Sequence, residues 1–177
     1  TIPHSFVADF DGAQVTNIVD MLQDEPYEAP MKPFGGVESL AWAPDGKSVV
    51  YVSRKKTGMA YALSTNSDLY QYNLETKETK NLTEGMMGYD TNPRFSKSGR
   101  YLAWLSMERD GYESDMNRIF ILDMENGEKK HLTANWDYAV DQMAWSPNEK
   151  AIFFTAPYLG CAPMFKIDVE TAEITTI

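Results

Sequence analysis

One short segment gathers the side chains best suited to bind a cation. Residues 107–115 read MERDGYESD and include Glu108, Arg109, Tyr112 and Glu113. A carboxylate beside an aromatic ring suits a primary ammonium such as a peptide N-terminus, because charge-assisted hydrogen bonds and ring faces both attract a cation. An arginine beside them could orient a carbonyl oxygen or contact another domain. The alternative is a charged loop that is simply solvated, or one in which Glu108 pairs with Arg109.

The residue types of a hydrolytic triad are present, but their spacing does not make a triad. The sequence lacks the Gly-x-Ser-x-Gly turn that exposes a nucleophilic serine. Its nearest approximation, GYESD at 111–115, lacks the second glycine and is expected between two strands, where Ser114 is not a nucleophile. His131 aligns with Asn81 in an outer strand, so we expect its side chain to face solvent. We assign no catalytic residue and expect these residues alone to be inactive.

Metal and cofactor chemistry find equally little support. The single cysteine, Cys161, excludes an internal disulfide framework and a cysteine-rich zinc site. The nearest approach to a calcium-binding loop is DFDG at 9–12, which we interpret as a hairpin turn. The sequence therefore predicts no metal site and no cofactor.

Composition narrows the possible partners. The 177 residues include 16 basic and 26 acidic side chains, a net charge of −10, and such a surface repels nucleic acid. The longest apolar run is about five residues, against the roughly 20 that span a bilayer. The first residues show no secretory leader. We expect neither nucleic-acid binding nor a membrane span.

The chain repeats itself, and the repeat predicts the fold. Three segments align: LAWAPDGKSVVYVS at 40–53, PRFSKSGRYLAWLS at 93–106 and MAWSPNEKAIFFTA at 143–156. Each has an aromatic residue at its third place, then a turn, then an apolar strand. We expect these aromatic residues to be core residues that pack one repeat against the next: Trp42, Phe95 and Trp145.

A second pattern follows each of these segments. It reads DLYQYNLETKETKNLT at 68–83, RIFILDMENGEKKHLT at 118–133 and PMFKIDVETAEITTI at 163–177. An Asn or Asp precedes the turn each time, and we expect it to cap the turn through backbone hydrogen bonds. These residues are Asn73, Asp123 and Asp168, and in the opening segment from Ser5 the matching residue is Asp9.

Each repeat is interpreted as four short strands in two hairpins. Alternating β-branched and aromatic residues, with Pro-Asp-Gly and Asn-Gly turns, favour strands, and convincing amphipathic helices are absent. Offsets of about 50 and 45 residues are typical of propeller blades. The sequence predicts an all-β fold, a partial β-propeller of about three and a half four-stranded antiparallel blades. A β-sandwich is the alternative.

The predicted organisation is a single partial propeller domain over residues 1–177. It comprises a blade remnant at 1–19, a long connecting loop at 20–36 and blades at 37–83, 90–133 and 140–177. Closed propellers have about four to eight blades. We therefore expect a piece of a longer protein, which by itself self-associates through its open blade edges.

Loop lengths divide the predicted propeller into two ends. The turns within hairpins are tight, whereas the connections between hairpins are long and emerge at the same end, called here the decorated face. The long connections are 20–36, 54–66, 84–92, 107–117, 134–142 and 157–162. They are rich in aromatic, Met and charged residues: Tyr27, Glu28, Tyr61, Met86, Met87, Tyr89, Asp90, Glu108, Arg109, Tyr112, Glu113, Trp136, Asp137 and Tyr138. The proline-rich loop 20–36 could instead be a rigid interdomain strap.

The repeats resemble those of TolB-like proteins and of peptidases of the prolyl oligopeptidase family. The shared motif is [LM]-A-W-[AS]-P-[DN]-G-K, followed by D-L-Y-x-Y-[ND]-L-E-T-x-E. The loops between 34 and 133, together with QDEPYEAPMKPFGG at 23–36, resemble the N-terminal propeller of bacterial dipeptidyl aminopeptidase/acylaminoacyl-peptidase-like enzymes. The resemblance covers essentially the whole chain.

This resemblance implies a larger propeller followed by an α/β-hydrolase domain that carries a Ser-Asp-His triad. The propeller would exclude folded proteins from the active site, and its carboxylates would hold the amine of a peptide substrate. Glu108 and Glu113 are the best candidates, with Arg109 and Tyr112 beside them. The implied partners are a peptide substrate and the hydrolase domain, and the resemblance favours a periplasmic location, with the cytoplasm as the alternative.

Two other functions stay open. A TolB-like binding module would dock another envelope protein without enzymatic activity, and a structural propeller would support a larger sensor. A downstream hydrolase domain with Gly-x-Ser-x-Gly would favour the peptidase, whereas a stop codon after five or six blades would favour the binding module.

Overall fold

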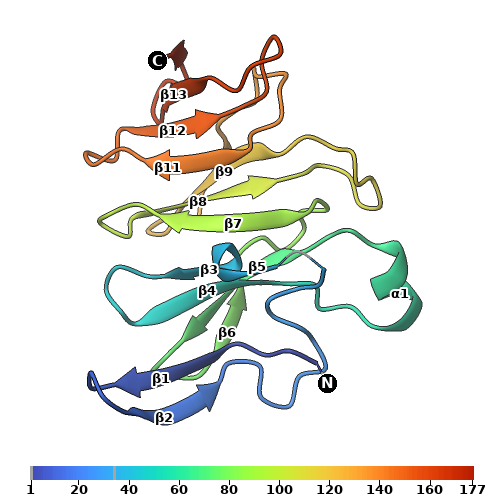
Figure 1. Ribbon diagram of the computed structural model, residues 1–177, viewed down its shortest axis with the longest axis vertical. Helices are drawn as coiled ribbons and strands as arrows, with labels where there is room; N and C mark the ends of the chain where they lie inside the picture. The colour runs from blue at the N-terminus through green and yellow to red at the C-terminus, as the bar shows by residue number, and fades with distance from the viewer. Residues whose placement is uncertain (1, 34) are drawn as a thin grey trace.

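A computed structural model describes residues 2–33 and 35–177, so Thr1 and Phe34 of the predicted domain lie outside the described residues. Within this part, strands form one two-stranded and three four-stranded antiparallel sheets (Figure 1). This confirms the predicted partial propeller of four-stranded blades. The strands are β1 Phe6–Phe10, β2 Val15–Asp20, β3 Leu40–Trp42, β4 Ser48–Ser53, β5 Asp68–Asn73, β6 Thr79–Asn81, β7 Asp90–Phe95, β8 Tyr101–Ser106, β9 Arg118–Asp123, β10 Lys129–His131, β11 Gln142–Trp145, β12 Ala151–Thr155, β13 Met164–Asp168 and β14 Ile174–Thr176.

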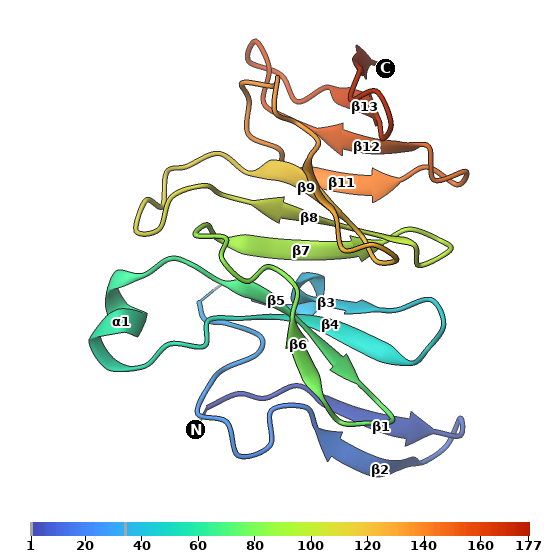
Figure 2. The same ribbon diagram turned by 180° about the vertical axis from the view of Figure 1, so that it is seen from behind.

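The sheets stack in chain order (Figures 1 and 2), and the core clusters combine residues from neighbouring sheets. All six residues of β4 are buried, because alternate side chains serve two different cores. Val49 and Tyr51 join the cluster facing the β1–β2 sheet, whereas Val50 and Val52 join the cluster facing the β7–β10 sheet. Burial on both faces explains why the second strand of each repeat reads as a continuous apolar run.

A stacked aromatic pair lies at the centre of each four-stranded sheet. Equivalent positions on the second and third strands are aligned across the ladder, and their rings lie 5.4–5.6 Å apart. The pairs are Tyr51–Tyr70, Trp104–Phe120 and Phe154–Phe165. These pairs recur once per blade, which makes them the repeated unit of packing.

The prediction that Trp42 is a core residue is wrong, because its side chain is 55% exposed. The equivalent Trp145 is half-buried: its ring stacks on Tyr101 at 6.1 Å, and its Nε1 donates to the Arg94 carbonyl at 2.9 Å. Those partners lie on the first two strands of the preceding blade. Ahead of Trp42 the described chain offers only the pair β1–β2. Phe95 packs, partly buried, against the core.

The predicted turn caps are confirmed in all three blades. The side-chain oxygen of Asn73 accepts from Glu75 N and Thr76 N at 2.9 Å, and Asp123 and Asp168 cap their turns in the same way. In the first hairpin the turn is capped by Asp11 and not by Asp9, the residue that aligns with Asn73 in the repeat. Asp11 accepts from the two following turn N–H groups at 2.8 Å, because β1 runs on through Phe10 and places the turn two residues later.

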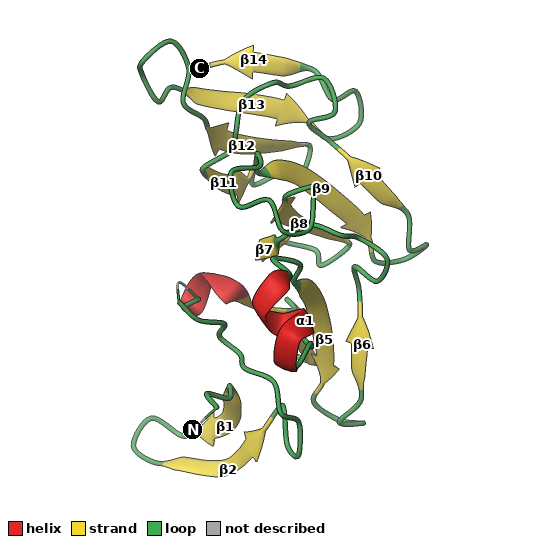
Figure 3. Cartoon of the chain, turned by 90° about the vertical axis from the view of Figure 1, so that its right-hand side faces the viewer, coloured by secondary structure: helices red, strands yellow, loops and turns green. Residues whose placement is uncertain are grey.

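Long loops and tight turns lie at opposite ends of the strands. In Figure 1 the hairpin turns point to the left, whereas the long connections and α1 lie on the right. One connection forms a short helix that the sequence did not predict, α1 (Gly58–Leu63), none of whose residues is buried. It and the 3₁₀ helix η1 (Val37–Ser39) are the red segments of Figure 3. No helix in the described part is long and apolar enough to cross a bilayer.

Equivalent turn positions generate a stability prediction. Gly127 has φ +77°, and Lys77 occupies the same place in the preceding blade with φ +63°. The left-handed region costs a side chain about 1 kcal/mol. Gly127→Ala should therefore lower the free energy of unfolding by about 1 kcal/mol, although no atom lies within 4 Å of the added Cβ. The matched change Lys77→Gly should be neutral or stabilising. Urea denaturation of both variants checks this, and equal losses would contradict it.

Candidate functional site

The loop 107–117 on the decorated face is organised by a buried carboxylate that the sequence did not single out. Asp115 Oδ2 accepts from the N–H groups of Glu108 and Arg109 at 3.0 Å. Its Oδ1 accepts from Met116 N at 2.8 Å and from the Arg118 guanidinium at 3.2 Å. The Asp115 side chain is 2% exposed. Both ends of the loop are thus held by one carboxyl group.

This environment determines the charge of Asp115. Burial alone would raise its pKa, but the donors from Glu108, Met116, Arg118 and Arg109 together hold the pKa far below the usual range. The carboxylate therefore stays ionised, and both of its oxygens accept hydrogen bonds from residues at the two ends of the loop.

The four predicted binding residues lie on the outside of the same loop. Glu108 is 71% exposed, and its Oε2 lies 3.2 Å from the Arg118 guanidinium. The Arg109 guanidinium covers the Tyr112 ring at 4.2 Å and lies 3.6 Å from Asp115. Glu113 is exposed near the tip. The alternative pairing of Glu108 with Arg109 does not form, because Arg118 and Asp115 are their respective partners.

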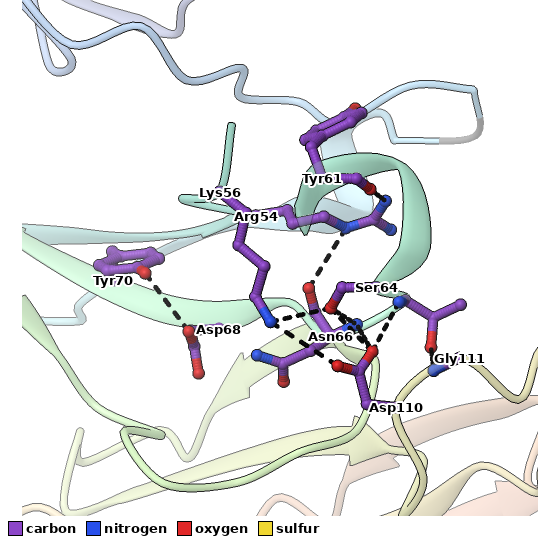
Figure 4. A network of polar contacts seen from close by, with 10 residues as sticks. Arg54, Lys56, Tyr61, Ser64, Asn66, Asp68, Tyr70, Asp110 and Gly111 are labelled. Atoms are coloured by element: carbon purple, nitrogen blue, oxygen red, sulfur yellow. Dashed lines mark hydrogen bonds and ion pairs between the residues drawn. The ribbon is translucent and has the colours of Figure 1, made fainter. Parts of the chain in front are cut away.

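The neighbouring loop 54–66 is hydrogen-bonded to this loop, and the two loops belong to adjacent blades. Asp110 Oδ1 accepts from the Ser64 hydroxyl at 2.7 Å, from Thr65 N at 2.8 Å and from Asn66 N at 3.1 Å (Figure 4). In return, Gly111 N donates to the Thr65 hydroxyl at 2.8 Å. The loop that carries the candidate residues is therefore positioned from two blades.

The loop 20–36 is tied to the same assembly. Glu28 accepts a hydrogen bond from the Tyr61 hydroxyl, and its carbonyl accepts from the Ser53 hydroxyl at 2.9 Å. The Lys55 ammonium pairs with Glu25 and lies 4.4 Å from the centre of the Tyr70 ring. These contacts hold the loop against the sheet β3–β6. Glu28 and Tyr61 are hydrogen-bonded to each other.

Other decorated-face residues turn inward. Asp90 is completely buried, and burial raises its pKa to about 7. Its Oδ1 accepts from the Trp104 indole at 3.1 Å. Trp136 packs into the core with Phe154 and Phe165, so neither it nor Asp90 is available to a ligand.

The prediction that His131 faces solvent is wrong. Its ring stacks on Phe120 with centres 4.5 Å apart and planes 11° apart, because the two residues are paired across β9 and β10. Burial and the charge of Arg118 lower its pKa. The prediction relies on the alignment of His131 with Asn81, and an asparagine has no ring that would indicate stacking at this position.

Among the residues that the structure describes, Ser114 and the two histidines do not come together as a triad. Ser114 is exposed in the loop 107–117 of the third sheet. His4 Nδ1 lies 2.7 Å from Asp20 Oδ2, beside the first sheet. Within residues 2–33 and 35–177, no three His, Cys, Asp or Glu side chains converge as metal ligands.

These features define a class of protein: a β-propeller with one decorated face and an acidic, internally braced loop on it. The sequence matches the model of the family described as "Dipeptidyl peptidase IV (DPP IV) N-terminal region" over residues 18–170. The chain belongs to this family.

Two relatives with the same name illustrate the similarity. The chain is 50% identical to dipeptidyl-peptidase 5 of Porphyromonas gingivalis over 177 residues, which is all of this chain and 26% of the relative. It is 31% identical to dipeptidyl-peptidase 5 of Schizosaccharomyces pombe over 154 residues, 85% of this chain and 22% of the relative. The chain thus spans about a quarter of the length of these relatives.

Solved structures with low sequence identity share the fold. A puromycin-hydrolysing peptidase of Mycobacterium tuberculosis superposes with a TM-score of 0.66 at 14% identity, over 98% of this chain and 24% of that one. TolB from Acinetobacter baumannii gives 0.60 at 22% identity, over 97% of this chain and 36% of that one. These likenesses support the propeller architecture.

The buried carboxylate generates a pH prediction. Asp115→Asn should lower the free energy of unfolding at pH 7 by roughly 2–4 kcal/mol, because four donors lose a charged acceptor. Since the folded pKa of Asp115 is lowered, its contribution is complete above the unfolded pKa and is lost as pH falls. At pH 3 the difference in free energy of unfolding between wild type and variant should be smaller than at pH 7 by about 1 kcal/mol. Urea denaturation at both pH values checks this, with Asp137→Asn, an exposed change, as control. A pH-independent difference would contradict it.

Proposed function

We propose that this chain is the non-catalytic propeller part of a serine exopeptidase of the dipeptidyl or acylaminoacyl peptidase type. It gates access and positions short peptides for an α/β-hydrolase domain of the same full-length chain. Family membership supports this, together with relatives about four times as long that are named dipeptidyl-peptidase 5. We also propose a periplasmic location.

The observation that carries the proposed role is the display of Glu108 and Glu113 on a braced loop. Asp115 accepts hydrogen bonds from N–H groups of the loop itself, and Asp110 accepts from Ser64 and Thr65 of the neighbouring loop, so the loop that carries the exposed carboxylates is held on both sides. Residues 107–118 contain four acidic and two basic side chains, so the loop is net acidic. Such a loop attracts the ammonium of a peptide N-terminus, and preorganisation lowers the entropic cost of binding it.

Arg109 and Tyr112 complete the proposed site. Because the guanidinium lies over the phenol ring, both present a broad flat surface beside the carboxylates. The N–H groups of Arg109 that do not face Asp115 can donate to a peptide carbonyl. The carboxylates would then bind the ammonium of the peptide, and the Arg109 guanidinium would bind its first carbonyl oxygen. Two contacts of opposite charge would orient the end of the peptide.

The alternative is a TolB-like module that binds another protein and has no catalytic domain. The TolB likeness supports the shared fold. Reading the gene beyond codon 177 distinguishes the two: a hydrolase domain with Gly-x-Ser-x-Gly supports the peptidase, and a stop codon after five or six blades supports the binding module.

Substitution of the two exposed carboxylates tests the amine-binding role. In the full-length protein, Glu108→Gln and Glu113→Gln should each raise KM for free-amine peptides by roughly tenfold to a hundredfold, the value of a charge-assisted hydrogen bond. Glu84→Gln, an exposed carboxylate in the connection 84–92, is the matched control. N-acetylated peptides should show no such difference. Unchanged KM in both variants would dismiss these residues as amine anchors.

The open first sheet supports the proposed self-association. Phe6, Phe10, Val15 and Ile18 are each 58–69% exposed on β1 and β2. Exposed apolar strands pair or pack readily. Residues 1–177 expressed alone should elute as oligomers in size-exclusion chromatography, and Phe6→Lys/Ile18→Lys should shift them toward monomer. A strict monomer at high concentration would overturn this expectation.

A further inference from the structure

We propose that a small pocket beside Glu108 is a subsite for one apolar side chain, that of the N-terminal residue of a bound peptide. The pocket has a volume of about 200 Å³ and is lined by three methionines, Met86, Met87 and Met107, by the stacked Phe120 and His131, and by the paired Glu108 and Arg118. This inference rests on the proposed function and adds the class of substrate to it.

The pocket lies where two blades meet at the decorated face. Met86 and Met87 come from the connection between β6 and β7, and Met107 follows β8 directly. Gly88 brings the two segments together, because a Cβ at that position would lie 1.5 Å from the Met107 carbonyl oxygen. The methionines from both segments therefore share one cavity.

The methionine part of the lining is apolar and adaptable. Thioether side chains are flexible and polarisable, so a pocket with three of them accepts apolar groups of different shapes. Phe120 and His131 provide a flat wall, since their rings are stacked at 4.5 Å. Because burial and Arg118 lower the pKa of His131, the imidazole is neutral at neutral pH and does not oppose an apolar occupant.

The polar edge of the pocket indicates which apolar group it would take. Glu108 lines the cavity and is 71% exposed, with one oxygen 3.2 Å from Arg118. In a peptide, the ammonium and the first side chain are attached to the same carbon atom. A residue whose ammonium binds Glu108 would therefore place its own side chain next to the methionines, which selects N-terminal residues such as Leu, Met or Phe over Gly.

The test compares two substrates in the full-length protein. Chromogenic dipeptide amides with the same second residue and either Leu or Gly first are assayed with Met87→Gln and Met87→Gln/Met107→Gln. Met87 is 55% exposed, so the single change does not threaten folding. We expect the Leu-to-Gly ratio of kcat/KM to fall roughly fivefold, with the Gly substrate nearly unchanged. Met59→Gln, at a 78% exposed methionine on α1, is the control and should keep the wild-type ratio.

The outcomes separate this inference from the proposed function. An unchanged ratio in both pocket variants, with KM still raised by Glu108→Gln, would overturn the subsite and leave the amine site standing. A ratio that falls equally in Met59→Gln would also overturn it. Absence of any free-amine peptide hydrolysis by the full-length protein would overturn the proposed function, and the subsite with it.

Discussion

The stacked aromatic pair at the centre of each blade is the contact on which the rest of the structure depends. Tyr51–Tyr70, Trp104–Phe120 and Phe154–Phe165 each join the second and third strands of a sheet. Large rings in aligned positions oppose a register slip, because a shift by one residue would move each ring to the other face of the sheet. With register defined, alternate residues of the same strand reach two different cores, and the stacked blades carry the long loops.

Carboxyl groups on the decorated face are of two kinds, which differ in their hydrogen-bond partners. Asp110 and Asp115 accept hydrogen bonds from backbone N–H groups, and the buried Asp90 accepts one from the Trp104 indole. Glu108 and Glu113 remain exposed to solvent. Asp110 and Asp115 position the loop 107–117, and the exposed Glu108 and Glu113 are the carboxylates proposed to bind a ligand. The pocket of methionines beside Glu108 lies on the same blade boundary, so charged and apolar recognition would be held by one braced unit.

Membership of the dipeptidyl peptidase IV N-terminal family gives this division a context. Under the proposed function, a propeller part would act on a peptide substrate through the shape and charge of its loops. A braced acidic loop has both properties. Its bracing crosses two blades, so the geometry of the site depends on how those blades pack.

The sequence by itself determined the repeat, the strand pattern, the tight and long loops and the capped turns at Asn73, Asp123 and Asp168. These features arise from neighbours within a few residues, and alternation and turn chemistry record them directly. Tertiary structure alone decided the rest. The partners of Asp110 lie 44–46 residues away, Asp115 closes a loop onto its own start, and Trp42 is exposed whereas Trp145 is covered. Trp42 and Trp145 are the same residue type at the same place in the repeat, yet only one of them is covered. Burial and hydrogen-bond partners depend on which strand or loop is adjacent in space, and a pattern of neighbouring residues in the sequence does not contain that information.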